Sequence, residues 1–309
     1  MGDATPIAVN KAAAWSALMA AGLSGLPGGL AAQPSTPRRI QPLSCSDALP
    51  APSAPSLRWR GRDVSWAEWP VRLGTRAISA TIIVVDIDPA RIALSLDIAR
   101  DGDALAPWSL DDAPADAALA LNAGQFTDAG PWGWVIHRGR EWQAPGQGPL
   151  SAAFAIDTSG RAVILRADEI ADARRRGGWT EVLQSFPLIL DDARMPPALC
   201  QPGAVDLEHR DIRLTIGTLP NGHVLLALTR YAGVGSAGSR LPIGPTTDEM
   251  ATIMRDLGAT RAVMLDGGLS AQLLLRDGSG GRDGDNTMRW NGLRRVPLAL
   301  VGHRTTDRR

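Results

Sequence analysis

Short apolar runs separated by turn residues fill the chain from residue 59 onward. Runs of this length, rich in Val, Ile and Leu, are typical of β-strands. Strands are therefore predicted at residues 76–85, 91–98, 117–121, 132–136, 152–157, 162–165, 182–190, 213–219, 223–229 and 296–301. Turn residues at 86–89, 137–140, 158–160 and 220–222 predict that the strands on either side pair as antiparallel hairpins. Pro187 lies inside one run, which indicates an edge strand or a bulge there.

Two segments carry helix signals instead. Residues 168–176 are polar and end at Gly177-Gly178, and residues 247–257 follow a Thr246 N-cap, begin with acidic residues and end at Gly258. Many strands with two or three helices predict an α+β fold. We expect a single domain with a mixed, largely antiparallel β-sheet core and a few flanking helices.

The first part of the chain differs from the rest in composition. Residues 1–32 combine Lys11, an apolar stretch and small residues, the pattern of a secretory signal peptide; a disordered Ala-rich leader is the alternative. Residues 33–58 are rich in Pro, Ser and Ala, which predicts an extended linker. The folded domain is expected at residues 59–309, exported to the periplasm or the cell exterior, with no stable membrane insertion after signal cleavage.

Composition narrows the possible partners. The chain has 309 residues, 44% of them apolar, and Lys plus Arg equal Asp plus Glu at 32 each. It is long and apolar enough for a substantial core, and it has no net charge to attract nucleic acid.

Cys45 and Cys200 are too far apart for a zinc or redox motif; they form either one disulfide or two free thiols. No cofactor and no metal are expected.

One segment is hard to explain by packing alone. Asp266 lies between the apolar run 262–265 and the pair Gly267 and Gly268, and a second apolar run follows at 271–275. Glycine allows positive φ and lets backbone N–H groups approach an anion, so the Asp266 carboxylate is expected to face a ligand, with Ser270 offering a hydroxyl. The alternative is a hairpin turn in which the aspartate bonds its own backbone.

Two earlier segments offer complementary chemistry. Asn122 ends the apolar run 117–121 and starts Asn122-Ala123-Gly124-Gln125-Phe126; its amide can donate and accept at once, although an Asx turn is the alternative. Arg213 starts the strand at 213–219, where its guanidinium can hold two phosphate oxygens, unless it simply faces solvent.

These three segments, in this order, resemble the phosphodiester glycosidase family over residues 75–303. The resemblance implies a hydrolase that removes a sugar from a phosphodiester by breaking the bond at the anomeric carbon. It implies that the Asp266, Arg213 and Asn122 segments form the site. We expect Asp266, Arg213, Asn122 and the nearby His209 to be catalytic, and Gly124, Gln125, Gly267, Gly268, Ser270 and Trp132 to bind the substrate.

The residue types fit that reaction. Its transition state carries positive charge on the sugar ring and negative charge on the departing phosphate. A carboxylate stabilises the first charge, and a guanidinium stabilises the second. His209 could move a proton, unless it is only a solvated loop residue, and Trp132, with Trp134, could stack on a sugar, unless both belong to the core.

Departures from the family pattern leave other functions open. Leu269 and Ala271 stand where the family usually has glycine and serine, and Thr229-Arg230-Tyr231 stands where it often has aspartate and glycine. We expect an exported hydrolase acting on a sugar phosphodiester in an envelope glycan or exopolysaccharide. One alternative is a noncatalytic glycan-binding or exopolysaccharide-assembly protein with the same fold, and another is a phosphodiesterase that attacks phosphorus.

Residues 277–286 contain alternating residues with oxygen ligands, which could hold calcium, but a mobile hairpin loop explains the segment better.

Overall fold

The computed structural model describes residues 37–46, 51–75, 77–101, 104–201, 203, 205–232, 241, 243–277 and 286–305. All of them belong to one compact unit, Thr36–Arg309. The expected signal peptide, most of the candidate calcium loop and most of the glycine-rich stretch 233–244 lie outside the described residues. No helix in the described ranges is long and apolar enough to cross a membrane.

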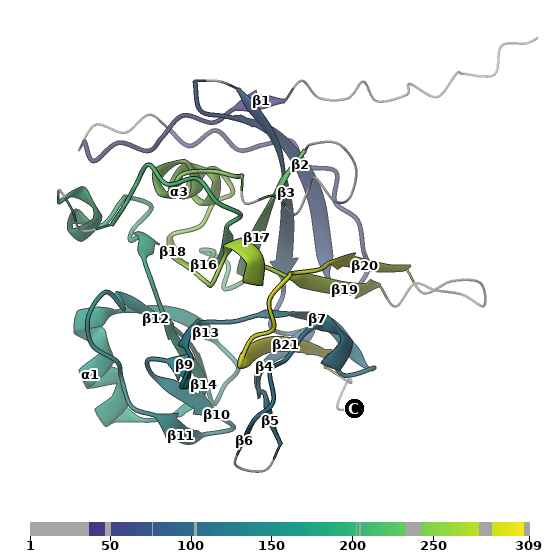
Figure 1. The fold of residues 1–309 in the computed structure, drawn as a ribbon, viewed down its shortest axis with the longest axis vertical. Coiled ribbons are helices and arrows are strands. Elements are labelled where there is room, and N and C mark those ends of the chain that lie inside the picture. The colour runs from purple at the N-terminus through teal and green to yellow at the C-terminus, as the bar shows by residue number, and fades with distance from the viewer. Residues whose placement is uncertain are drawn as a thin grey trace, which may run out of the picture. The chain divides into compact units, whose positions relative to one another are not determined.

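The largest sheet has seven strands (Figure 1). Their spatial order is β1 (Arg38–Arg39), β2 (Ser65–Leu73), β3 (Ile78–Ile87), β17 (Val224–Tyr231), β16 (Leu214–Thr218), β18 (Arg261–Met264) and β15 (Leu188–Leu190). β1 is parallel to β2, and all other neighbours are antiparallel.

Two five-stranded antiparallel sheets accompany it. The first has the order β11 (Arg140–Gln143), β10 (Val135–His137), β14 (Trp179–Ser185), β12 (Ala152–Asp157) and β13 (Ala162–Arg166). The second has the order β20 (Asn286–Trp290), β19 (Leu273–Asp277), β7 (Ala117–Asn122), β21 (Leu298–Arg304) and β4 (Ile92–Ile98).

Small elements complete the described fold. Two-stranded ladders join β5 (Arg100–Asp101) to β6 (Ala104–Leu105) and β8 (Gln125–Thr127) to β9 (Gly130–Trp132). The α-helices are α1 (Ala167–Arg176) and α3 (Thr247–Asp256), and short 3-10 turns occupy Leu110–Asp112, Pro197–Cys200 and Gly268–Ser270. The predicted α+β class, dominated by antiparallel strands, is confirmed.

Alternate residues of the strands face two separate parts of the hydrophobic core. Along β17, Val224, Leu226 and Leu228 face a core shared by all three large sheets, whereas Leu225 and Ala227 face the α3 side. Successive strand residues point to opposite faces, so a continuous apolar run such as 224–228 indicates a strand buried on both sides. Helix α3 covers the second face with buried residues such as Met250 and Ile253.

Three of the four predicted hairpins form: β10 with β11, β12 with β13, and β16 with β17. The fourth prediction was wrong. β3 and β4, on either side of residues 88–91, do not pair; β3 joins the seven-stranded sheet and β4 pairs with β21. β3 lies between β2 and β17, and all seven residues of β4 pair with β21; β17 and β21 are far away in the chain, so a local turn signal cannot show them.

The run 182–190 is also not one strand. It divides into β14 and β15, which belong to different sheets, and the cis peptide Phe186-Pro187 lies between them. Proline has no N–H for a ladder, so the chain leaves one sheet at this point and enters the next.

Part of the segment expected to be a linker packs on the sheet. β1 pairs with β2, and Ile40 and Leu43 are buried in the core on the α3 side. Cys45 and Cys200 form a disulfide that closes a loop with a sequence separation of 155 residues. The bond fastens residues 37–46 to the body of the fold.

We predict that replacing both Cys45 and Cys200 by serine lowers the free energy of unfolding by about 2–5 kcal/mol, because the unfolded chain regains the freedom that the closed loop removes. Urea denaturation of the oxidised protein and the double variant measures the difference. A reducing agent should shift only the oxidised protein, and equal midpoints for both proteins would contradict a stabilising role.

Candidate functional site

Asp266 lies where the chain crosses from β18 in the seven-stranded sheet to β19 in a five-stranded sheet. The two strands do not pair, so the hairpin alternative for this segment was wrong. The Asp266 amide donates to the carbonyl of Gly124 at 3.2 Å, and the Gly268 amide donates to the carbonyl of Ile212 at 2.8 Å. The crossing therefore contacts the segments that carry the Asn122 motif and Arg213.

Glycine is required at both positions after Asp266. A Cβ on Gly267 would lie 2.4 Å from the carbonyl oxygen of Ile212. Gly268 has a φ of +53°, and a Cβ there would lie 2.8 Å from Oδ2 of Asp211. The two glycines let the crossing lie directly against residues 211–213, which no other residue type would permit without displacement.

Asn122 is fully buried and uses its amide to hold this crossing. Its Nδ2 donates to the backbone carbonyl of Asp266 at 2.7 Å, and its Oδ1 accepts from the backbone amide of Gln272 at 2.9 Å. Both functions of the amide are thus occupied by backbone. The structure brings Asn122 to Asp266, as a residue that positions the turn.

The Asp266 carboxylate combines burial with an open hydrogen-bonding position. Its Oδ2 is buried and has no hydrogen-bond partner. Burial raises the pKa of Asp266 above its ordinary value, because desolvation disfavours the charged form. A hydrogen bond with Ser270 and the charge of Arg294 act in the opposite direction, and the charge of Asp211 adds to the increase in this pKa. An unsatisfied buried acceptor of this kind is the feature expected of a group that meets a ligand.

Arg294 was missed by the sequence analysis. Its backbone amide donates to the carbonyl of Leu269 at 3.0 Å, and its guanidinium carbon lies 4.7 Å from the centre of the Phe126 ring. The side chain is exposed and acts electrostatically on Asp266. Its neighbour Arg295 instead bonds Asp112 and the carbonyl of Pro107. Nothing in the local sequence distinguishes the two arginines.

Arg213 lies beside the crossing, but its side chain serves a loop. The guanidinium donates to the backbone carbonyls of His209 at 2.6 Å and Pro245 at 3.3 Å. Burial lowers the pKa of Arg213, while the charges of Asp211 and Asp206 raise it. These contacts stabilise the 206–213 loop and occupy N–H groups that a phosphate would need.

His209 and Asp211 form an exposed pair at the edge of the site. The Nε2 of His209 lies 3.9 Å from Oδ2 of Asp211, and the histidine side chain is 62% exposed. Asp211 also accepts from the Ile212 amide at 2.7 Å. Through Asp211, which adjoins Gly268, His209 is linked to the Asp266 turn.

The remaining predicted binding residues lie on the other side of the turn. Gly124 has a φ of +67° and places its carbonyl against the Asp266 amide. Gln125 pairs with Trp132 across the β8–β9 ladder, and its Nε2 donates to the carbonyl of Phe186 at 3.4 Å. Trp132 packs edge-on against Phe186 with ring centres 5.8 Å apart and is partly exposed, as a stacking residue must be.

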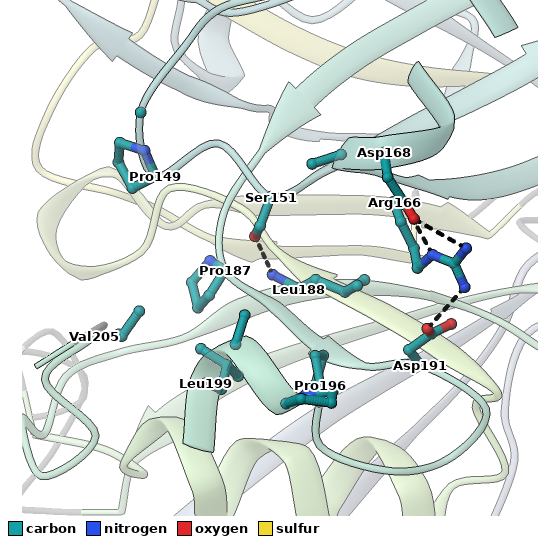
Figure 2. A pocket seen from close by; sticks show the side chains of 14 residues that line it. Pro149, Ser151, Arg166, Asp168, Pro187, Leu188, Asp191, Pro196, Leu199 and Val205 are labelled. Atoms are coloured by element: carbon teal, nitrogen blue, oxygen red, sulfur yellow. Dashed lines mark hydrogen bonds and ion pairs between the residues drawn. The ribbon is translucent and has the colours of Figure 1, made fainter. Parts of the chain in front are cut away.

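Pro187 lines a separate cavity of about 570 Å³ (Figure 2). The lining also includes Leu188, Leu199 and several prolines, and its charged residues are Arg166, Asp168 and Asp191, with Arg166 paired to both aspartates. None of the site residues described above is part of this lining. In the part of the chain that the structure describes, no three His, Cys, Asp or Glu side chains are grouped to hold a metal ion.

We predict that Asn122→Ala lowers the free energy of unfolding by about 2–3 kcal/mol, because two buried backbone groups lose their partners. Asn221→Ala is the matched control, since Asn221 is exposed and accepts only from the His223 amide in its own turn. Urea denaturation should show a clearly smaller effect for the control. Equal effects would show that the buried amide has no special role.

The raised pKa of Asp266 predicts a pH-dependent stability. The folded chain binds this proton more tightly than the unfolded chain, so stability falls as pH rises from the ordinary value of 3.8 through the raised pKa. Asp266→Asn removes the cost of the buried charge, so its unfolding midpoint should exceed that of the wild type near pH 7 and converge with it towards acid pH.

Urea denaturation at several pH values tests this prediction. Asp128→Asn, at an exposed position, is the control for the loss of one carboxylate from the surface. A constant difference for Asp266→Asn would contradict the predicted cost of charging Asp266.

Comparisons with known proteins agree with this description of the fold. The chain is similar to a hypothetical protein from Synechocystis (17% identity, TM-score 0.52, 81% of this chain covered). It spans only 64% of that protein, less than two thirds. It is also similar to the zebrafish N-acetylglucosamine-1-phosphodiester alpha-N-acetylglucosaminidase catalytic domain, auto-inhibited by its pro-peptide (16% identity, TM-score 0.56), with 85% of this chain and 87% of that domain covered.

A putative exported protein from Burkholderia pseudomallei is more distant, at 14% identity and a TM-score of 0.46 with 74% of each chain covered. No curated protein sequence matches the chain. At these identities, the Synechocystis and zebrafish structures show that the fold is shared. The model of the Phosphodiester glycosidase family matches residues 115–301, more than half of the chain. This protein therefore belongs to the phosphodiester glycosidase family.

Proposed function

We propose that the protein is an exported hydrolase that cleaves the bond between a sugar's anomeric carbon and a phosphodiester oxygen in an envelope or extracellular glycan. The observation that carries the proposal is the Asp266 carboxylate, whose Oδ2 is buried and unpartnered where four chain segments meet. Membership of the family supports a glycosidase-type hydrolase.

The chemistry needs few protein groups. When the bond from the anomeric carbon to oxygen breaks, its electrons go to a phosphate oxygen, and a phosphate monoester leaves. The second pKa of such a monoester is about 6, so the leaving group departs as an anion without a general acid. Water supplies the oxygen that bonds to the anomeric carbon. One carboxylate for the positive ring and one cation for the phosphate are sufficient.

The described side chains divide these tasks. Asp266 stabilises the positive ring or the attacking water, and Arg294, the cation that acts on Asp266, attracts the phosphate. Trp132 offers a partly exposed ring for the sugar. We assign the proton of the attacking water to His209, which is exposed and pairs with Asp211. Arg213 stabilises the loop that holds this pair.

The disulfide between Cys45 and Cys200 supports the export part of the proposal. Disulfides persist in the periplasm and outside the cell and are rare in the reducing cytosol. The signal-like pattern in residues 1–32 is consistent with the same compartment. Fractionation of cells that express the full chain tests this point, and an accumulation of reduced protein in the cytosol would contradict it.

The noncatalytic alternative also has an observation in its favour. Asn122 is fully buried and its amide bonds two backbone groups, and the Arg213 guanidinium bonds backbone carbonyls, so both side chains have contacts within the protein. A protein with this site could bind a glycan phosphate at Arg294 without cleaving it. Binding of a sugar phosphodiester by a wild type that turns over none would favour this alternative.

We predict that purified wild type releases free sugar from at least one synthetic sugar-1-phosphodiester, and that Asp266→Asn lowers kcat by about 10²–10³-fold or more, because the amide cannot stabilise the positive ring. A chromatographic assay of released sugar measures the rates. In isotopically labelled water the label should end on the sugar. Label on the phosphate would instead identify a phosphodiesterase that attacks phosphorus.

We predict that Arg294→Gln and Arg213→Gln have opposite signatures. Loss of the Arg294 charge should lower kcat/KM by about 10–100-fold with little change in Tm, because it removes a charge-assisted contact to phosphate. Arg213→Gln should lower Tm and largely retain kcat/KM, because its contacts are within the protein. Arg295→Gln is the control for Arg294 and should leave kcat/KM unchanged. If Arg213→Gln lowered kcat/KM and Arg294→Gln lowered Tm, Arg213 would be the residue that binds the phosphate.

A further inference from the structure

Two exposed leucines adjoin the candidate site. Leu269 is 49% exposed and Leu293 is 60% exposed, although large apolar side chains are mostly buried in this fold. Leu269 belongs to the 3-10 turn that directly follows Asp266 and Gly267. Leu293 immediately precedes Arg294. Exposed apolar side chains that gather beside a polar site indicate a surface that binds an apolar group.

The backbone holds the two leucines together. The amide of Leu293 donates to the carbonyl of Leu269 at 2.7 Å, and the amide of Arg294 donates to the same oxygen at 3.0 Å. A Cβ on Gly292 would lie 3.0 Å from the carbonyl oxygens of Leu269 and Ser270, so this loop lies closely against the Asp266 turn. The leucine pair is therefore built into the site.

A buried arginine, Arg230, helps to hold the loop that carries Leu293 and Arg294. The Nη2 of Arg230 donates to the carbonyl of Ala271 at 2.9 Å and to that of Asn291 at 3.5 Å. Arg230 is only 5% exposed. It joins the Asp266 crossing to the loop that carries Leu293 and Arg294. The backbone segments that carry Asp266, Arg294 and the two leucines are therefore connected by hydrogen bonds.

The candidate site combines the three kinds of group that a sugar phosphodiester of an apolar alcohol would contact. Asp266 provides negative charge, Arg294 provides positive charge within its electrostatic reach, and Leu293 and Leu269 provide apolar surface next to Arg294. A sugar at Asp266 and a phosphate at Arg294 would place the alcohol of the phosphodiester against the leucines. A polar alcohol gains little binding free energy from this surface. Contact between an alkyl chain and the leucines removes apolar surface of both from water, which favours binding.

Resting on the proposed function, we infer that the alcohol esterified to the sugar phosphate is an alkyl or other apolar chain, bound by Leu269 and Leu293. The substrate class is then a sugar-1-phosphate ester of an apolar alcohol. Cleavage releases the sugar and an alkyl phosphate.

The test compares two esters of the same sugar phosphate, one with hexanol and one with glycerol, prepared for glucose, galactose and N-acetylglucosamine. For the sugar that is released fastest, kcat/KM should be at least about tenfold higher for the hexyl ester. Leu293→Ser and Leu269→Ser should each reduce that ratio, because they lower kcat/KM more for the hexyl ester than for the glycerol ester. Trp142→Ser is the control, because Trp142 is 41% exposed on the edge strand β11 and should leave the ratio unchanged. Equal rates for the two esters would overturn the inference while the proposed function stands.

Binding separates the two proposals. Hexyl phosphate and glycerol phosphate are titrated into wild type and into Leu293→Ser by calorimetry. Tighter binding of hexyl phosphate that is lost in Leu293→Ser supports the apolar subsite even if no ester is hydrolysed, in which case only the proposed hydrolysis fails. Equal affinity for both phosphates overturns the subsite.

Discussion

The side-chain amide of Asn122 is the contact on which the candidate site depends. It joins β7 to the segment that runs between the two sheets, by donating to the Asp266 carbonyl at 2.7 Å and accepting from the Gln272 amide at 2.9 Å. A crossing between sheets has no ladder of its own, so its backbone groups need partners from elsewhere. Asn122 satisfies one group at each end of the crossing and so fixes residues 266–272.

The hydrogen bonds that Asp266 makes to Gly124 and Asn122 use its backbone groups and not its carboxylate. Its Oδ2 remains buried and without a partner, and burial raises its pKa. The fold thus retains a group that disfavours the folded state at neutral pH. Such a group is a common cost of a binding or catalytic site, because a carboxylate already satisfied by the protein could not respond to charge on a substrate.

The arginines around this turn have separate tasks. Arg230 and Arg213 donate to backbone carbonyls and hold loops, whereas Arg294 is exposed next to the carboxylate. A buried guanidinium is well suited to carbonyl oxygens because it offers several donors in a fixed plane. Residue type alone therefore says little about which arginine meets a phosphate. The leucines beside Arg294 add aliphatic surface to a site that also contains charged groups and aromatic rings.

Local patterns in the sequence predicted many of the described elements and indicated Asp266 as a candidate site residue. Short apolar runs, turn residues and the Thr246 cap act between residues a few positions apart, so many of the strands, three hairpins, α1 and α3 could be predicted, whereas β2 and β20 were not. Tertiary structure alone decided which strands share a sheet, that β3 and β4 separate, and that Arg294 rather than Arg213 acts on the carboxylate. These outcomes depend on contacts between residues far apart in the chain, where total burial and backbone hydrogen bonding decide between partners that look alike in sequence.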